Sequence, residues 1–513
     1  MNSCTSSSIC SVTMGTSSVS KTLSATVNQY TLSITKGTGV GTIYYKINGT
    51  SSYTSTTSNA SLSVNYGTTY YYYGSPSSGY YMTSCTSSSP CSGTMTTSGA
   101  SVSLVAYEAV YQLYNSSGTS TGYATSLSNA ISSVSSGGTV KALKNNSSAA
   151  VTVSKNVTIN TNGYTITMTG TLTNSSEYKL SITGSGKIYS TSSLEELILT
   201  YGTTNLTSAT VYCTSCSNAV WVYGTFVMNS GTVRGGNGNG FMVRAGTLEI
   251  YSGTIIGDTA SGINFGGGNL TLTTSASNIS VSGLLYGIIA GSVYADSDIV
   301  ISGNTSEGPY IEIFATSTSN ISATALSINS ASSYSYSSTV KIEGAALYSY
   351  GHGVANGVSS TMTINKNVII ESKNYTLLNK NILYLGYNST SSTLDSSIDD
   401  YVTIANANYT YPIYNYANAT IYMGGGTYVY DTRDTSSYTS DNTKKPVANY
   451  GTINLNGGRI YYSYGVPSAF YNLGSGVVNQ SGWGYNTGTY TYKFQYYTAG
   501  TSYTIKRYSY KKS

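Results

Sequence analysis

The sequence is short of charge, and this scarcity excludes one large class of partner. Charged residues make up only 8% of the 513 residues, and aspartate and glutamate together number 18. The net charge of +5 is small for this length, and no dense cluster of lysine and arginine is interleaved with aromatic residues. Because nucleic-acid-binding proteins concentrate basic residues along the phosphates, no nucleic acid is expected as a partner.

Long apolar runs are also missing. A transmembrane helix needs about 18 or more consecutive apolar residues, and no such run occurs, so no transmembrane segment is expected. The first residues, MNSCTSSSIC, lack the basic region and the apolar run of an export signal.

Polar uncharged residues and tyrosine take the place of charge. The chain has 54 tyrosines and 55 glycines, with abundant valine, isoleucine and threonine. Disordered chains are usually charged and poor in aromatic and β-branched residues, so this composition predicts an all-β protein. The length suits several domains or one extended repeat architecture.

Two segments near the N-terminus are copies of one another. Ser3–Ser20 recurs as Ser84–Ser101, with 13 of 18 positions identical. The second copy closes a stretch of domain size that has the alternating pattern of β-strands. We therefore expect residues 1–20 to be the remnant of a preceding module and residues 21–104 to be a complete module, in a chain that is a fragment of a longer protein.

Six cysteines fall into local pairs, namely Cys4 with Cys10, Cys85 with Cys91, and Cys213 with Cys216. Local pairing suits an oxidising compartment, and the first two spacings can close a hairpin disulfide, with reduced thiols or a metal site as alternatives. Around Cys213, the segment VYCTSCSNAVWVYG predicts strand, turn and strand rather than the strand and helix of a redox motif. A zinc site would need a second ligand pair. We expect a turn disulfide or a buried thiol pair there.

A solenoid pattern begins after a short helix. Leu127, Ala130, Ile131 and Val134 have helical spacing, and strands with period two start at Thr139. Downstream, GTFVMNSGTV at residues 224–233 recurs as GTLEIYSGTI 22 residues later. Two short strands and a glycine turn per repeat cannot bury an apolar face alone, whereas stacked coils can.

These repeats predict a β-helix over residues 105–485 and a C-terminal β or tail segment over residues 486–513. We expect roughly 15 coils, spanning roughly 70 Å at the strand spacing. Serine, threonine and asparagine at outward or turn positions would form hydrogen-bonded ladders. Charge would be scarce because like charges stacked at this spacing repel one another.

The helix, the GGTVKAL step, the KNVTINTNGYTITMTG coil and the GTLEIYSGTI repeats resemble the pectin-lyase-like, right-handed parallel β-helix of bacterial adhesin-like surface proteins. The resemblance covers about Val105 to Gly482. The upstream module is similar to small immunoglobulin-like stalk repeats of bacterial surface proteins. The resemblance implies an all-β fold and an extracellular, cell-surface or cell-wall location. It implies no single activity, because this solenoid carries lyases, hydrolases, tailspikes and adhesins.

Acidic residues that could serve catalysis are few. A lyase of this fold would need clustered carboxylates for calcium plus a basic residue, and a glycosidase two or three close acids. Asp296 and Asp298 share one face of a strand and could bind a cation or activate water, or could be structural. Asp431, Arg433 and Asp434 precede a polar insertion, which favours a surface ion pair, with a binding loop as the alternative. No catalytic residue, cofactor or metal is expected.

The single histidine and the many tyrosines are the remaining candidates. His352 lies between two glycines in SYGHGVANG and is expected to be a turn residue. Tyrosine can stack on sugar rings, or it can simply form strands whose polar tips tolerate water. The runs Tyr70–Tyr73 and Tyr461–Tyr462 are the places where binding is expected, if tyrosine binds.

The sequence therefore favours a non-catalytic, monomeric, secreted or cell-surface adhesin-like protein whose β-helix displays loops that bind glycans or host proteins. A polysaccharide lyase or glycoside hydrolase is the first alternative. A purely structural spacer is the second.

Overall fold

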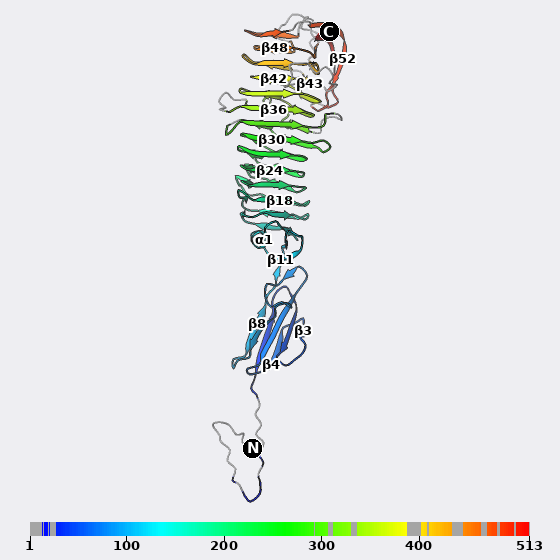
Figure 1. The fold of residues 1–513 in the computed structure, drawn as a ribbon. Coiled ribbons are helices and arrows are strands. Elements are labelled where there is room, and N and C mark those ends of the chain that lie inside the picture. The colour runs from blue at the N-terminus through cyan, green and yellow to red at the C-terminus, as the bar shows by residue number, and fades with distance from the viewer. Residues whose placement is uncertain are drawn as a thin grey trace. The chain divides into compact units, whose positions relative to one another are not determined.

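The computed structural model describes residues 13, 15–18, 20, 27–291, 293–305, 311–329, 336–386, 402–407, 410–432, 445–462, 469–479, 483–496 and 499–511. The chain forms two compact units, Met1–Ala109 and Val110–Ser513 (Figure 1). Cys4, Cys10, Arg433 and Asp434 lie outside the described residues.

The first unit is built from two small β-sheets. One consists of β4 (Ala60–Asn65), β1 (Gln29–Lys36) and β8 (Ala100–Leu104), and the other of β3 (Thr54–Thr56), β2 (Val40–Ile47), β5 (Thr69–Pro76) and β7 (Cys91–Thr94). A short pair, β6 (Tyr80–Tyr81) and β9 (Tyr107–Glu108), adjoins them. Leu32, Ile34 and Ile43 are fully buried in their common core. The likeness to an immunoglobulin module stays a prediction.

The second unit opens with a cap. Strands β10 (Tyr111–Tyr114) and β11 (Ser120–Ala124) are antiparallel, and α1 (Leu127–Ser133) follows them. The Ser126 hydroxyl accepts a hydrogen bond from the backbone N–H of Asn129 at 3.3 Å, which satisfies a free donor at the helix start. The apolar stripe that predicted this helix is buried, so the prediction of a capping helix is confirmed.

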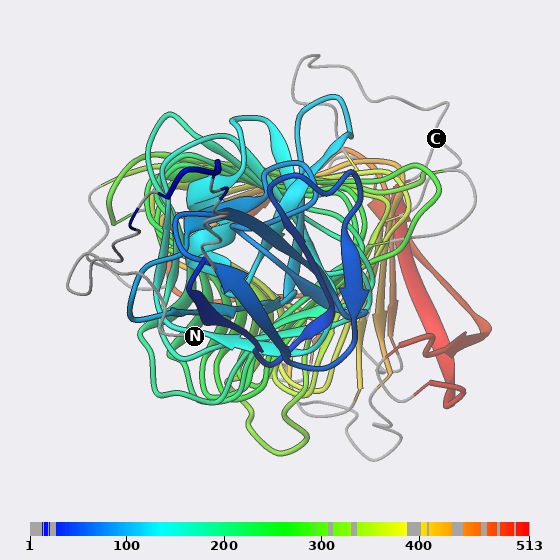
Figure 2. The ribbon, with the colours of Figure 1, turned by 90° about the horizontal axis from the view of Figure 1, so that it is seen from below.

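Three parallel sheets form the stack of coils (Figures 1 and 2). The first sheet contains β12 (Gly138–Ala142), β15 (Val157–Asn160), β18 (Lys179–Thr183), β21 (Thr203–Leu206), β24 (Thr225–Met228), β27 (Gly246–Ile250), β30 (Gly268–Thr273), β33 (Ser297–Ser302), β36 (Ser338–Glu343), β39 (Ser360–Ile364), β42 (Ile382–Leu385), β45 (Thr420–Met423), β48 (Thr452–Leu455) and β51 (Val477–Asn479). The second contains β13 (Asn146–Ser148), β16 (Thr165–Met168), β19 (Lys187–Ser190), β22 (Thr210–Cys213), β25 (Thr232–Gly235), β28 (Gly253–Gly257), β31 (Ile279–Gly283), β34 (Ile311–Ala315), β37 (Ala345–Ser349), β40 (Val368–Ser372), β43 (Val402–Asn406), β46 (Thr427–Asp431) and β49 (Arg459–Tyr462). The third contains β14 (Val151–Val153), β17 (Leu172–Asn174), β20 (Glu196–Thr200), β23 (Asn218–Val222), β26 (Asn239–Val243), β29 (Ser261–Phe265), β32 (Tyr286–Ala290), β35 (Thr324–Ile328), β38 (His352–Asn356), β41 (Leu377–Asn379), β44 (Ile413–Asn415), β47 (Val447–Asn449) and β50 (Phe470–Asn472).

The predicted all-β, parallel β-helical fold is confirmed, and the repeat holds in register, since Thr203, Thr225 and Thr247 are direct neighbours in the first sheet. The expectation of two strands per coil is wrong, because each coil has a third strand. The third sheet has 13 strands, so the described coils also number 13 rather than roughly 15. Most third strands were not recognised in the sequence because glycine and asparagine begin several of them, as in NGFMV of β26, whereas β23 with NAVWV was predicted.

Alternating side chains fill one continuous core. Along the third sheet, Val220, Phe241 and Ile263 stack in register, and all three are fully buried. A buried Leu, Ile or Phe side chain contributes about 1.5–3 kcal/mol, so the stack gains stability coil by coil.

Asparagine forms a ladder at the buried last residues of strands β38, β41, β44 and β47, rather than at outward or turn positions. The Nδ2 atom of Asn356 donates to Oδ1 of Asn379 at 2.7 Å, Asn379 donates to Asn415 at 2.9 Å, and Asn415 donates to Asn449 at 2.8 Å. All four side chains are buried. The same amide of Asn379 also donates to the backbone carbonyl oxygen of Thr420 at 3.2 Å, so the ladder satisfies buried polar groups of the corners.

A C-terminal hairpin ends the second sheet. Strands β52 (Trp483–Lys493) and β53 (Ser502–Lys511) are antiparallel, and β53 pairs with β49, also antiparallel. The hairpin lies on the outside of the coils (Figure 2). Tyr492 and Phe494 are buried in a cluster with Ala405 of β43, with Ala407 just after this strand, and with Tyr461 of β49.

Candidate functional site

The predicted acidic candidates are dispersed. Asp296 accepts hydrogen bonds at Oδ1 from the backbone N–H of Ser337 at 2.8 Å and from its hydroxyl at 3.0 Å, which fixes a coil corner. Asp298 is exposed on β33, beside Asn269 and Thr339 of the neighbouring coils. A binding role for this pair stays a prediction.

Asp431 differs from its expected surface position. Its side chain is fully buried at the end of β46, in register with Asn406 of β43. The expected surface position is therefore wrong for this residue, and an ion pair with Arg433 stays a prediction. Strand β46 continues to Asp431, whose side chain points inward, and the polar insertion begins only after this residue.

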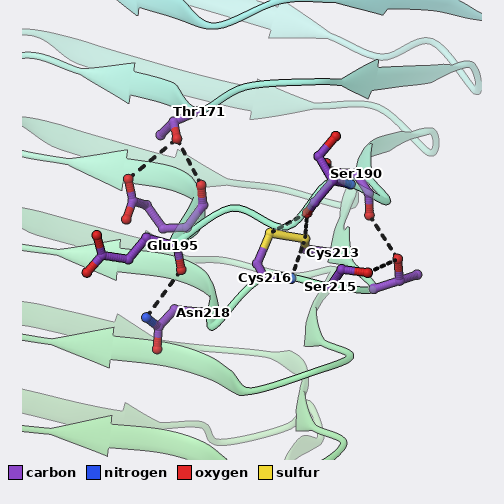
Figure 3. Close-up of a disulfide and its surroundings, with 10 residues drawn as sticks. Thr171, Ser190, Glu195, Cys213, Ser215, Cys216 and Asn218 are labelled. Carbon is purple, nitrogen blue, oxygen red and sulfur yellow. Dashed lines mark hydrogen bonds between the residues drawn. A yellow bond between two sulfur atoms is a disulfide. The ribbon is translucent and has the colours of Figure 1, made fainter.

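The CxxC segment forms a disulfide at a coil corner. Cys213 ends β22 and Cys216 lies before β23, and both are fully buried (Figure 3). The backbone N–H of Cys216 points to Sγ of Cys213 at 3.1 Å. The predicted sequence of strand, turn and strand is confirmed here. Cys85 and Cys91 of the first unit are also joined by a disulfide.

The tyrosine runs behave differently from one another. Tyr461 and Tyr462 are buried in strand β49, so this run offers no exposed ring for a ligand. In the first unit, Tyr44 and Tyr73 stack with ring centroids 4.6 Å apart, and Tyr70 lies in the core.

The outer face of the third sheet is distinguished by its charge. From β23 to β50 its strands contain no aspartate or glutamate. The acidic residues of the other strands in these coils lie on the first sheet or on the second sheet, namely Glu249, Asp298, Glu343, Glu312, Glu371 and Asp431. We call the outward side chains of β23 to β50, with the corner residues beside them, the third-sheet face.

A depression of about 200 Å³ lies on this face. Its lining combines hydroxyl, amide, imidazole, ammonium and phenol groups, from residues that include Ser322, Thr324, Ser327, His352, Lys380 and Tyr416. A larger hollow of about 650 Å³ lies beside Tyr251 at the turns after β30 and β33, but its lining has no charged residue and only this one ring. The smaller depression is therefore the better equipped for recognition.

His352 lies in the depression as the first residue of β38, so the expectation of a turn residue is wrong. Burial lowers the pKa of its imidazole, and a hydrogen bond to the backbone of Tyr375 only partly opposes this effect. Its Nδ1 atom is buried without a hydrogen-bond partner among the described residues. A neutral imidazole has one donor and one acceptor nitrogen, which matches a hydroxyl group.

A group of tyrosines adjoins the depression. The ring of Tyr414 lies 5.4 Å from that of Tyr375, 4.6 Å from that of Tyr416 and 5.5 Å from that of Tyr450, between centroids. Lys380 Nζ lies 5.2 Å from the centre of the Tyr416 ring. Burial, followed by a hydrogen bond with Tyr450, raises the pKa of Tyr414, so its hydroxyl keeps its proton.

Sequence reasoning did not find this group, although a signal was present. Tyr411, Tyr414 and Tyr416 lie within the short segment YPIYNY, at the spacing of a strand and its two corners. Tyr375 and His352 come from earlier coils, and only the stacking of coils brings them beside it.

Comparison with known protein families, with curated proteins and with solved structures found no match to this chain. Within the described ranges, no group of three or more His, Cys, Asp and Glu side chains is placed to hold a metal ion. In the same part of the chain, no helix has the length and apolar character that a membrane crossing requires.

Proposed function

We propose that this chain is a non-catalytic, adhesin-like protein that binds glycan chains on the third-sheet face. The observation that supports this proposal most directly is the depression at His352, Lys380 and Tyr416. Tyrosine rings border the depression, and the strands of this face contain no acidic residue. Aromatic rings stack on the apolar faces of sugars, while hydroxyl, amide and imidazole groups exchange hydrogen bonds with sugar hydroxyls.

The absence of carboxylates from the third-sheet strands supports binding over catalysis. A glycosidase of this fold would need two close acids, and a lyase would need acids for calcium. The strands from β23 to β50 supply neither. The polysaccharide-processing alternative therefore has to draw on residues outside those strands.

An extracellular or cell-surface location belongs to the same proposal. Two local disulfides, Cys85–Cys91 and Cys213–Cys216, are favoured in an oxidising compartment. In this proposal the first unit is an immunoglobulin-like stalk module, and the protein acts as a monomer.

A glycan array tests the proposal. Wild-type protein should bind a subset of glycans, and Tyr416→Ala should weaken that binding by about tenfold, since contacts of an aromatic ring contribute about 0.5–1.5 kcal/mol beyond the area that they bury. Tyr422→Ala is the matched control, because Tyr422 stacks on Tyr384 on the first sheet, with centroids 4.9 Å apart. Circular dichroism checks that both variants are folded.

The alternatives predict other outcomes of the same experiment. A structural spacer binds no glycan, a receptor for host proteins binds cell-surface proteins after glycan removal, and an enzyme releases shorter sugars from the bound glycan. Any of these results, or equal binding by Tyr416→Ala and Tyr422→Ala, contradicts the proposal.

A further inference from the structure

A second aromatic cluster lies at the start of the third-sheet face, several coils before the depression, and extends to Tyr201 at the corner after β20. Trp221 points outward from β23, and Tyr201 and Tyr223 occupy equivalent corners after β20 and β23, since Tyr223 N–H donates to Thr200 O. The ring of Tyr223 lies 5.1 Å from that of Tyr201 and 5.7 Å from that of Trp221, both stacked. Tyr201 is also exposed, so part of this pile faces solvent.

Arg244 occupies the next corner and is surrounded by these rings. Its guanidinium carbon lies 4.2 Å from the centre of the Tyr294 ring, 5.9 Å from that of Trp221 and 6.0 Å from that of Tyr223. Its Nη1 atom donates to the Tyr223 hydroxyl at 3.1 Å. We call Tyr201, Trp221, Tyr223, Arg244 and Tyr294 the Arg244 clasp.

Gly266 makes room for this arrangement. A Cβ atom at Gly266 would lie 2.7 Å from the Tyr294 ring, so any other residue would displace the ring that covers the guanidinium. The missing side chain at Gly266 therefore leaves the space in which the Tyr294 ring lies over Arg244.

The guanidinium of Arg244 forms hydrogen bonds with the Tyr223 and Tyr294 side chains but has no anionic partner among the described residues. Within the described ranges no carboxylate lies within ion-pair distance of Arg244, whereas Arg234 on the second sheet pairs with Asp258 at 2.8 Å. The Trp221 Nε1 atom is buried and has no hydrogen-bond partner there either. A guanidinium held against aromatic rings matches an oxyanion such as a carboxylate or a sulfate, and the rings match an apolar sugar face.

The clasp and the depression lie on one strip of register neighbours in the third sheet. Met242, Asn264 and Ile289 are half-buried along this strip, and Ser327 and Ala355 are buried in the lining of the depression. None of the five carries a charge. Four strand spacings separate β26 from β38 in the order of the third sheet, which is roughly 20 Å.

We propose that the Arg244 clasp is a second sugar subsite, selective for a ring that carries an oxyanion, and that one glycan chain lies along the strip and occupies both subsites. This inference rests on the proposed glycan binding at the depression. Binding at two linked subsites makes affinity depend on chain length, because the second contact forms at high effective concentration.

The test uses the full chain with three oligosaccharide series of graded length: oligogalacturonides for carboxylate, heparin fragments for sulfate, and xylan fragments as neutral sugars. Calorimetry compares wild type with Arg244→Gln and with Arg234→Gln, the matched arginine control on the second sheet. For long acidic oligosaccharides, Arg244→Gln should lower affinity by about tenfold and reduce its salt dependence. For short neutral oligosaccharides, which need only the depression, affinity should not change.

The outcomes separate the two proposals. If Arg244→Gln lowers the affinity for only one acidic series, the clasp is supported and its oxyanion is the carboxylate or the sulfate of that series. If Arg244→Gln lowers the affinity for both acidic series, the clasp is supported and accepts either anion. Equal binding by Arg244→Gln and Arg234→Gln, or binding of wild type to neutral sugars alone, overturns the clasp. If Tyr416→Ala still weakens binding in that case, the proposed function stands; if it does not, both fail.

Discussion

His352 shows how the burial of one ring changes its chemistry. On β38 it contacts the Tyr375 ring, with centroids 5.7 Å apart, and burial lowers its pKa from the usual 6.5. In the unfolded chain the imidazole is not buried, so its pKa is the usual value of about 6.5. The imidazole therefore binds its proton more weakly in the folded protein than in the unfolded one.

This difference predicts a pH dependence. Between the lowered folded pKa and the unfolded value of about 6.5, the unfolded chain binds more protons, so stability falls as the pH decreases through this window and His352 has no effect above it. Denaturant unfolding from about pH 5 to about pH 8 should show this loss in wild type.

His352→Gln should lack that part of the dependence. Subtracting the two curves cancels the effect of other groups, such as Glu196, whose pKa is raised by burial. Parallel curves for the variant and wild type would contradict the prediction.

At the scale of elements, the C-terminal hairpin depends on one carboxylate of the stack. Glu371 on β40 is fully buried and accepts hydrogen bonds from the Tyr492 hydroxyl at 2.8 Å and from the backbone N–H groups of Gln495 and Tyr496 at 2.8 and 2.7 Å. Burial and then the charges of Glu312 and Glu371 raise the pKa of Tyr496 to about 12, so this tyrosine remains protonated in the contact.

Replacing Glu371 by Gln should loosen the hairpin. An amide lacks the charge and has only one acceptor oxygen, so the contact should lose about 1–3 kcal/mol. Hydrogen exchange at the Gln495 and Tyr496 amides should accelerate, while the amides of the coil core stay protected.

Glu249→Gln is the control for this change. Glu249 lies on the first sheet, and its Oε2 accepts a hydrogen bond from the exposed Tyr251 hydroxyl at 3.0 Å, away from the hairpin. Unchanged exchange of the hairpin in Glu371→Gln would show that the carboxylate does not hold it.

Local pattern made some elements predictable and left others hidden. The stripe of Leu127, Ala130 and Ile131 and the alternation of Thr225–Met228 report burial directly, because each side chain meets the core of its own coil. The burial of Glu371 could not be predicted from the local segment VIIES, because its hydrogen-bond partner Tyr492 is 121 residues away. The aromatic clusters share this origin, as rings from successive coils meet only after stacking.

For the whole second unit, side chains should be coupled within one coil or between neighbouring coils and not at a distance. Within one coil, the Phe226 ring of β24 and the Phe241 ring of β26, both fully buried, meet edge to face with centroids 5.0 Å apart. Leucine at both positions should show a coupling energy of about 0.5–1.5 kcal/mol in a double-mutant cycle.

A distant pair provides the control. Phe226→Leu combined with Ile404→Val on β43 should be additive within about 0.5 kcal/mol, because repeats contact only their neighbours. Hydrogen exchange measures both cycles coil by coil. Strong coupling of the distant pair would mean that the coils unfold as one cooperative block.

The antiparallel strands at the two ends also bear on self-assembly. An open end of a parallel stack is a row of free backbone donors and acceptors, on which another molecule can continue the winding into a filament. Here β10 runs against β12 and β53 runs against β49, so strand direction reverses at one edge of the first sheet and one edge of the second. An incoming parallel coil meets the wrong polarity at both places. At these two sheet edges the reversal of strand direction disfavours the addition of a further parallel coil.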